Sequence, residues 1–210
     1  MFGQAALAVL PLDKAGLLGT PFLPQDFHPK VLVQIDFPQT GASVQLGNEL
    51  TPDQGQGDPV VSFVAAAQDP EEQQSTYCLL SFDPDAPSRE NQEFGPWRHY
   101  VLGGLKPKSI EEISSAVESK GERGVANQGL VEQTESPISP WVAPSPGKGT
   151  GLHRYCFALY KQPRPLKPLE EQATIKSNER PDRRKFDVAS FATDNELELV
   201  GFNFFLCQNP

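Results

Sequence analysis

The sequence predicts a mainly β fold, with long loops and few helices, for this chain of 210 residues. That length suits one domain with room for a small appendage, and it is sufficient to bury a large core. Proline accounts for 21 of the residues, which is about twice its average share. Because proline ends helices and is kept out of central strands, this content favours short elements joined by loops. Many short apolar runs with a period of two point the same way.

The first element in chain order is a short helical arm over residues 1–24, in which AALAVL and LDKAGLL are interrupted by Pro11. The run VLVQIDF, residues 31–37, alternates apolar and polar side chains as a half-buried strand does. Apolar runs rich in β-branched and aromatic residues predict the remaining strands, which we place at residues 60–66, 77–82, 98–104, 153–160 and 201–207.

Two helices are expected among these strands. In SIEEISSAVES, Ser109 stands as the N-cap and Glu112 follows three residues later, which is the pattern of a capping box. In FDVASFATDNEL, Asp187 is the candidate cap, and Val188 and Phe191 are expected to face the core.

We therefore divide the chain into an N-terminal helical arm, residues 1–24, and a single domain, residues 25–210. An irregular insertion around residues 107–140 interrupts the domain. A connection of that length is usually either functional or mobile. No internal repeat is evident.

The overall charge excludes several kinds of partner. Lys and Arg together number 18 against 27 Asp and Glu, which gives a formal net charge of −9 and a pI of about 4.8. Long-range attraction to nucleic acid or to an anionic membrane surface is therefore not expected. Any anion that binds must be held by local geometry against an unfavourable field.

The three cysteines, Cys78, Cys156 and Cys207, each lie in an apolar run and match no zinc-binding spacing. We interpret them as buried, reduced thiols, which indicates a reducing compartment. The N-terminal stretch lacks the basic region of a signal peptide, and no run is long enough to span a bilayer. A cytoplasmic protein without a transmembrane segment is the expectation.

Two carboxylates separated by one residue mark the segment FDPDAPSRENQEFGPWRHY. Asp83 and Asp85 would share one face if the strand continued, but Pro84 cannot donate to a strand ladder, so the strand is expected to end at Asp83. One interpretation is a turn in which the Asp side chains accept backbone N–H bonds. The other is a site, because His99 and His153 each open an aromatic-rich strand, and strand ends are where such side chains converge.

Three kinds of site remain open on the residues alone. Two His and two Asp form a possible metal-ligand set, but the close His spacing that preorganises such sites is missing. A hydrolase built on the Asp and His residues lacks a G-x-S-x-G elbow, although Ser88 follows the acids. The stretch PSPGKGTGLHRY is either a flexible turn or a nest of backbone N–H groups that binds an anion beside His153.

The combination of DPDAPSR, W-R-H, GTGLHRY and a later R-x-K-F block resembles the phosphatidylethanolamine-binding protein family, which includes the Raf kinase inhibitor proteins. The resemblance runs in order from about Asp26 to Phe205. The N-terminal arm and the acidic DPEEQQ turn look most like the carboxypeptidase Y inhibitor branch. The resemblance implies a β-sandwich with a large central antiparallel sheet, a smaller second sheet and a few peripheral helices.

It also implies a small anion pocket at the strand ends that holds phosphate-like head groups without a metal or cofactor. In this pocket the two imidazoles would donate to the anion, the carboxylates would orient them or meet an ethanolamine ammonium, and aromatic rings would form the walls. The residues carried over as ligand-binding are Asp83, Asp85, Pro87, Trp97, His99, His153 and Tyr155.

The function implied is a non-enzymatic, phospholipid-head-group or phosphate-binding regulator, with inhibition of a serine carboxypeptidase of the carboxypeptidase Y type as the first hypothesis. In that mode the arm and an exposed surface would inhibit, and the anion pocket need not. A kinase-cascade or Ras-pathway interaction protein is the alternative, and a hydrolase that uses the Asp and His cluster is the third possibility.

The chain departs from the family pattern in three places. Pro96 stands where many members carry an acid before the Trp, and Ser145 stands where a glycine is common. The insertion is also longer than in compact members, so the usual protein partners of the family cannot be assumed.

Overall fold

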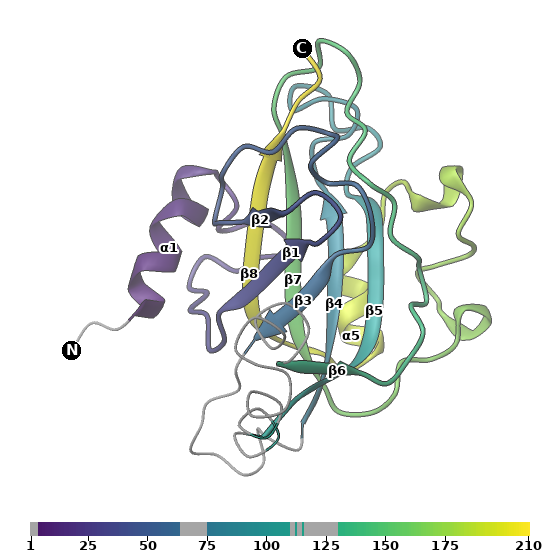
Figure 1. The fold of residues 1–210 in the computed structure, drawn as a ribbon. Coiled ribbons are helices and arrows are strands. Elements are labelled where there is room, and N and C mark those ends of the chain that lie inside the picture. The colour runs from purple at the N-terminus through teal and green to yellow at the C-terminus, as the bar shows by residue number, and fades with distance from the viewer. Residues whose placement is uncertain (1–3, 64–74, 110–111, 113–114, 116–129) are drawn as a thin grey trace.

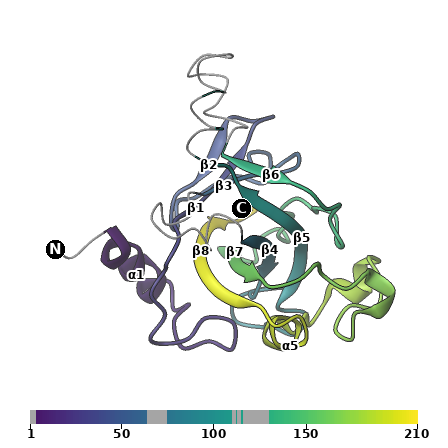
Figure 2. The ribbon, with the colours of Figure 1, turned by 90° about the horizontal axis from the view of Figure 1, so that it is seen from below.

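The computed structural model describes residues 4–63, 75–109, 112, 115 and 130–210. The strands form two antiparallel sheets, one of three strands in the order β2-β1-β3 and one of five in the order β6-β5-β4-β7-β8. Figure 2 shows the small sheet on one side of the large one and α5 on the other. The predicted mainly β sandwich with two antiparallel sheets and a few peripheral helices is confirmed.

The strand bounds are close to those predicted from the apolar runs. The small sheet consists of β1 (Val33–Phe37), β2 (Ala42–Val44) and β3 (Val60–Phe63). The large sheet consists of β4 (Thr76–Asp83), β5 (Trp97–Pro107), β6 (Val131–Gln133), β7 (His153–Gln162) and β8 (Glu198–Cys207). The sequence did not predict β2 and β6, which have three residues each, and the end of the run expected at 60–66 lies outside the described residues.

The central strands are buried on both faces because each face packs on a different layer. On β4, Leu79 belongs to the cluster between the two sheets, whereas Leu80 faces the opposite layer. On β7, Phe157 and Ala158 divide in the same way. On β1, buried side chains alternate with exposed or partly exposed ones, as expected, because only one face of the small sheet packs on the large sheet. Neighbouring residues of the large sheet therefore point to two separate environments.

The layer opposite the small sheet is built from the N-terminal arm and from the segment that includes α5 (Val188–Asp194). Asp187 caps α5 by accepting the backbone N–H of Ser190 at 2.9 Å, and Val188 and Phe191 are buried, as predicted. Two 3-10 helices, η1 (Leu169–Glu171) and η2 (Arg180–Arg183), lie in the same segment.

The helix α1 (Gln4–Lys14) runs through Pro11 rather than ending there, so the expectation of an interruption at this residue was wrong. A proline removes one backbone bond without ending a helix that is held by other contacts. Here the next residue, Leu12, is completely buried, as are Leu17 and Leu23 further along the arm. Leu12 within α1 and Leu17 and Leu23 after it therefore belong to the core, while the division of the chain after residue 24 stays a prediction.

The reciprocal hydrogen bonds of the predicted capping box are present. The backbone N–H of Ser109 donates to the Glu112 carboxylate at 2.8 Å, and that of Glu112 donates to the Ser109 hydroxyl at 3.2 Å. The rest of the helix predicted here lies almost entirely outside the described residues.

The three cysteines are free and buried, as predicted. Burial raises the pKa of Cys207 to about 12 and that of Cys78 further. In the part of the chain described here, no helix has both the length and the apolar character that crossing a bilayer would require.

Candidate functional site

Strand direction brings the predicted site residues to one edge of the large sheet. β4 is antiparallel to both β5 and β7, so the end of β4 lies beside the beginnings of its two neighbours. Asp83, the last residue of β4, pairs with Trp97, the first residue of β5, and His153 is the first residue of β7. Residues from two distant parts of the sequence are therefore neighbours here.

A cavity of about 280 Å³ opens at this edge. Six of the seven predicted residues line it, namely Asp83, Pro87, Trp97, His99, His153 and Tyr155. Asp85 is absent from the lining. The Ala86–Pro87 and Gly95–Pro96 peptide bonds of the loop beside the cavity are cis. A Cβ atom on Gly95 would lie only 2.1 Å from the carbonyl oxygen of Pro84, so this loop closes on itself only with glycine at position 95.

Asp83 takes part in both of the arrangements considered from the sequence. Its Oδ1 accepts the backbone N–H of Asp85 at 2.8 Å, which is the turn interaction. Its Oδ2 lies 2.7 Å from Nδ1 of His153. Both side chains are almost fully buried. The carboxylate therefore fixes the loop and orients an imidazole at the same time.

The other nitrogen of His153, Nε2, lies 2.9 Å from the hydroxyl of Thr150. Thr150 donates its single hydroxyl proton to the carbonyl oxygen of Gly147 at 2.8 Å, so it must accept from His153. With a carboxylate at Nδ1, both ring nitrogens then carry protons. Burial opposes this charge, but the hydrogen bond to Asp83 and the negative charges of Asp83 and Asp85 raise the pKa of His153 above its ordinary value.

His99 has a different environment. Burial, aided by the positive charges of Arg183 and His153, lowers its pKa to about 3. Nδ1 lies 2.6 Å from the carbonyl oxygen of Val142 and must donate to it, which leaves Nε2 as an acceptor at neutral pH. The ring packs edge-on against Tyr155, with centroids 4.9 Å apart. His99 thus contributes a neutral, oriented wall to the cavity, and we drop the expectation that it donates to an anion.

Asp85 lies on the opposite face of the sheet, where it binds Arg154. Its Oδ2 accepts from the backbone N–H and from Nε of Arg154 at 2.9 and 2.8 Å, and its Oδ1 accepts from Nη2 at 2.6 Å. Oδ1 also accepts from Gln92 at 2.8 Å. Asp85 is completely buried, and its oxygens are occupied by these donors. The structure therefore assigns it to a buried ion pair.

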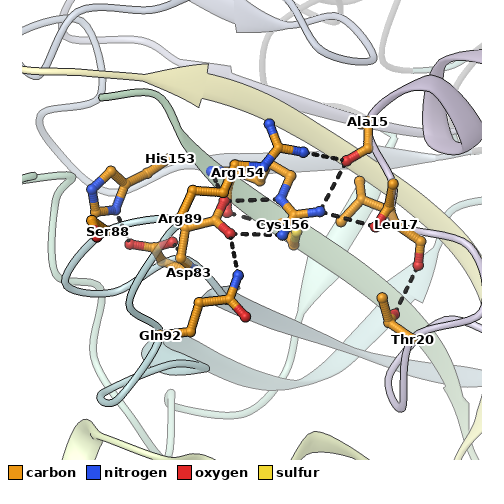
Figure 3. Close-up of polar contacts among 12 residues, drawn as sticks. Ala15, Leu17, Thr20, Asp83, Ser88, Arg89, Gln92, His153, Arg154 and Cys156 are labelled. Carbon is orange, nitrogen blue, oxygen red and sulfur yellow. Dashed lines mark hydrogen bonds and ion pairs between the residues drawn. The ribbon is translucent and has the colours of Figure 1, made fainter. Parts of the chain in front are cut away.

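This ion pair also holds the N-terminal arm. Arg154 donates through Nη1 to the carbonyl oxygens of Ala15 and Gly16 at 2.9 and 3.0 Å, and Arg89 donates to Ala15 at 2.8 Å. Figure 3 shows His153 directed toward Asp83 and its neighbour Arg154 directed toward the arm. Successive residues of a strand point to opposite faces, so adjacent positions serve the cavity and the arm.

The glycine-rich turn lies beside the cavity, and part of its hydrogen-bonding capacity is used within the protein. Gly147 contributes to the lining. The backbone N–H of Gly149 donates to Asn209, and that of Thr150 donates to Gly147. Two backbone donors of the turn are therefore used within the protein, and the nest of backbone N–H groups stays a prediction.

Sequence reasoning missed two cationic residues of the lining, Arg180 and Arg184. Both belong to the stretch RPDRRKF, and both are exposed. The guanidinium carbon of Arg184 lies 4.0 Å from the centre of the Phe94 ring, a cation–π contact. The density of basic residues in an acidic chain was the available signal. Among the residues with described positions, no group of three or more His, Cys, Asp or Glu could hold a metal ion.

The chain is similar to known proteins over most or all of its length. The family model described as "Phosphatidylethanolamine-binding protein" matches residues 40–205. The carboxypeptidase Y inhibitor of Saccharomyces cerevisiae is 28% identical over 224 aligned residues, which cover 99% of this chain and 96% of that protein. The uncharacterized protein YLR179C of the same yeast is 26% identical over 174 residues, with 79% of this chain and 76% of that protein covered.

Solved structures agree on the fold. A crystal structure of carboxypeptidase Y inhibitor complexed with its cognate proteinase superposes with a TM-score of 0.77 at 24% identity, covering 100% of this chain and 98% of the other. A phosphatidylethanolamine-binding protein from Plasmodium vivax gives a TM-score of 0.65 at 23% identity, covering 96% and 97% of the two chains. Since the family model spans more than half of the sequence, the chain belongs to the phosphatidylethanolamine-binding protein family.

Proposed function

We propose that this protein is an inhibitor of a serine carboxypeptidase. The observation that carries the proposal is the extent of the match to the yeast carboxypeptidase Y inhibitor, which spans nearly the whole of both chains. The family model begins at residue 40, so the match includes the N-terminal segment that the family model leaves out. The full-length match to the inhibitor favours this function over the kinase-cascade or Ras-pathway alternative.

The N-terminal arm is the part of the molecule that we propose contacts the protease. Figures 1 and 2 show α1 at the edge of the molecule, with its N-terminal end directed away from both sheets. Leu10 on α1 is 59% exposed, whereas Leu12 and Leu17 anchor the arm in the core. Leu10 can therefore contact a partner without unfolding the domain.

Titration of a serine carboxypeptidase with the full chain tests the proposal directly. We expect stoichiometric loss of peptidase activity. A truncation that removes residues 1–9 keeps the core anchors Leu12 and Leu17 and is expected to raise the inhibition constant at least tenfold. Undiminished peptidase activity at saturating full-length protein would remove the proposal. Equal inhibition by the full chain and by the truncated protein would support the inhibitor function and show that residues 1–9 do not contribute to it.

We further propose that the 280 Å³ cavity binds a phosphate-like anion. Arg180 and Arg184 supply positive charge at the lining, and the Asp83–His153 pair is preorganised, which lowers the cost of ordering on binding. In an NMR titration with inorganic phosphate, the imidazole signals of His99 and His153 are expected to shift. Exposed His28 lies outside the lining and serves as the internal control. Unchanged His99 and His153 signals would contradict phosphate binding.

The proposed function includes no catalytic step. Thr150, His153 and Asp83 are connected in the order of a nucleophile, a base and an orienting acid, but Thr150 donates its proton to Gly147 and so accepts from His153. The hydroxyl is therefore not activated by the imidazole. If ester turnover is detected, its loss in both His153→Ala and Thr150→Val would support the hydrolase hypothesis instead. Turnover retained in His153→Ala would place the activity elsewhere.

A further inference from the structure

Two arginines give the cavity a charge opposite to that of the whole chain. The formal net charge is −9, yet Arg180 and Arg184 both line the cavity and Asp83 is the only carboxylate in the lining. In the part of the chain described here, the ion pairs involve other residues, and neither arginine takes part in one. Both guanidinium groups are therefore available to a guest.

The segment that carries these arginines is fixed against the beginning of β5. Arg183 is buried and donates to the carbonyl oxygens of Asn178, His99 and others at 3.0 to 3.3 Å. Arg98, also buried, donates to the carbonyl oxygens of Ser177 and Asp182 at 2.6 and 3.1 Å. Two internal arginines thus hold the backbone from which the two cavity arginines extend.

The stacking of Arg184 on Phe94 adds to this order. With its guanidinium carbon 4.0 Å from the ring centre, the side chain is held where Phe94 itself lines the cavity. A stacked guanidinium keeps its N–H groups free at the edge of the plane, so it can still donate two parallel hydrogen bonds.

The described residues of the cavity provide no unoccupied carboxylate to bind an ammonium group. Both oxygens of Asp83 accept hydrogen bonds from the protein, one from Asp85 and one from His153. Asp85 is turned to the other face of the sheet, and Pro96 contributes no charge. An ethanolamine head group would therefore bring a cation to a cavity whose available charges are positive.

We propose that Arg180 and Arg184 bind the phosphoryl group and make this cavity selective for a terminal phosphomonoester over the phosphodiester of an ethanolamine phospholipid. The inference rests on the anion-binding function proposed above and specifies its ligand. A monoester near neutral pH carries a charge between −1.5 and −2 and three terminal oxygens. It can engage two guanidinium groups, whereas a diester carries one charge and two such oxygens.

The cavity volume limits how much of the ligand enters. About 280 Å³ holds a phosphoryl group with a short substituent, whereas the long acyl chains of a lipid would remain outside. The monoester can therefore come from a small soluble molecule or from phosphatidic acid, which present the same chemistry to the arginines.

Calorimetric titration of the full chain at pH 7.5 and constant ionic strength tests the selectivity. The probes are methyl phosphate, dimethyl phosphate and glycerophosphoethanolamine. We expect methyl phosphate to bind at least about tenfold more tightly than either diester, since it forms additional charge-assisted hydrogen bonds. Dihexanoyl phosphatidic acid distinguishes the sources: tighter binding than methyl phosphate indicates a lipid, and equal binding indicates a soluble monoester.

Variants assign the selectivity to the two side chains. R180Q and R184Q are each expected to weaken methyl phosphate several-fold, and the double variant is expected to bind methyl and dimethyl phosphate equally. R164Q is the matched control, because it makes the same charge change at an exposed arginine that pairs with Glu196 just beyond the other end of β7. It should leave all three affinities unchanged. All three arginines are exposed, so the variants are expected to fold.

The outcomes distinguish a failure of the proposed selectivity from a failure of the proposed anion-binding function. If no phosphate probe binds the full chain, the anion-binding function fails and the selectivity falls with it. If the probes bind but do not discriminate, or if R180Q/R184Q retains the affinity of the natural sequence for methyl phosphate, the cavity remains an anion site and the role given to the two arginines is wrong.

Discussion

Asp83 and Asp85 lie two positions apart, and their side chains have opposite surroundings. Asp83 faces the cavity and orients His153, while Asp85 pairs with Arg154 beneath the N-terminal arm. In a continuous strand, residues two apart would share a face. Because β4 ends at Asp83, the turn at Pro84 redirects the second carboxylate. The role of each acid follows from where the strand stops.

Replacing Asp85 with alanine is expected to lower the free energy of unfolding by about 3–5 kcal/mol, because it leaves the guanidinium of Arg154 buried without its counter-charge. Urea denaturation measures the change. Glu198→Gln is the control, since it breaks the exposed pair between Lys30 and Glu198 and should cost no more than about 1 kcal/mol. Equal effects of the two substitutions would contradict the role assigned to the buried pair.

His153 is expected to make stability depend on pH. Its pKa is raised in the folded protein above the value of about 6.5 for an unperturbed imidazole. The protonated ring therefore stabilises the fold fully below about pH 6.5, and this contribution is lost as the pH rises through the folded pKa. Urea denaturation between pH 5 and 9 should show the difference between the natural protein and His153→Gln shrinking as pH rises. A pH-independent difference would argue against an Asp83–His153 ion pair.

At the scale of elements, the N-terminal arm combines a partly exposed helix with a buried continuation. α1 ends at Lys14, and the chain then passes through carbonyl groups held by Arg89 and Arg154 before Leu17 enters the core. The arm is therefore fastened by polar and apolar contacts at the same place.

Leu17→Ala is expected to reduce the free energy of unfolding by about 2–5 kcal/mol, because the side chain is completely buried and its removal leaves a cavity. Leu10→Ala changes the same residue type at a position that is 59% exposed and should alter stability by no more than about 0.5 kcal/mol. Thermal or urea denaturation of both variants measures the contrast. A small effect at Leu17 would show that the arm contributes little to the folded domain.

The long strands could be predicted from sequence because apolar runs rich in aromatic and β-branched residues follow one another between turn signals. β2 and β6 have only three residues each, ASV and VEQ, which is too short for a periodic pattern. The N-cap of α5 was predictable because the signal is local. The continuation of α1 through Pro11 could not be predicted, because it depends on the burial of Leu12 against residues far along the chain.

The site was predictable to the extent that it depends on strand ends. Antiparallel neighbours place the end of β4 beside the beginnings of β5 and β7, so residues in the two motifs meet. The direction of Asp85 depends on the turn at Pro84, and the position of Arg180 depends on how the buried side chain of Arg183 anchors a loop far along the chain. Such contacts between loops leave no periodic trace in the sequence.

At the scale of the whole molecule, the large sheet is covered on both faces, and the cavity opens at its edge. A ligand bound there by the folded state alone must stabilise the entire fold. Methyl phosphate at about 100 times its dissociation constant should raise the free energy of unfolding by about 2.7 kcal/mol. Urea denaturation with and without the ligand gives the value, and sodium chloride at equal ionic strength is the control. An equal rise in chloride would indicate general screening instead of binding.

His153 and Arg154 are joined by a single peptide bond, yet one belongs to the cavity and the other secures the arm. Two adjacent residues of the sequence therefore have separate roles. Genetic changes in this short stretch, or in the DPD motif opposite it, are expected to be pleiotropic. A substitution here that weakens protease inhibition is expected to weaken the proposed phosphate binding as well.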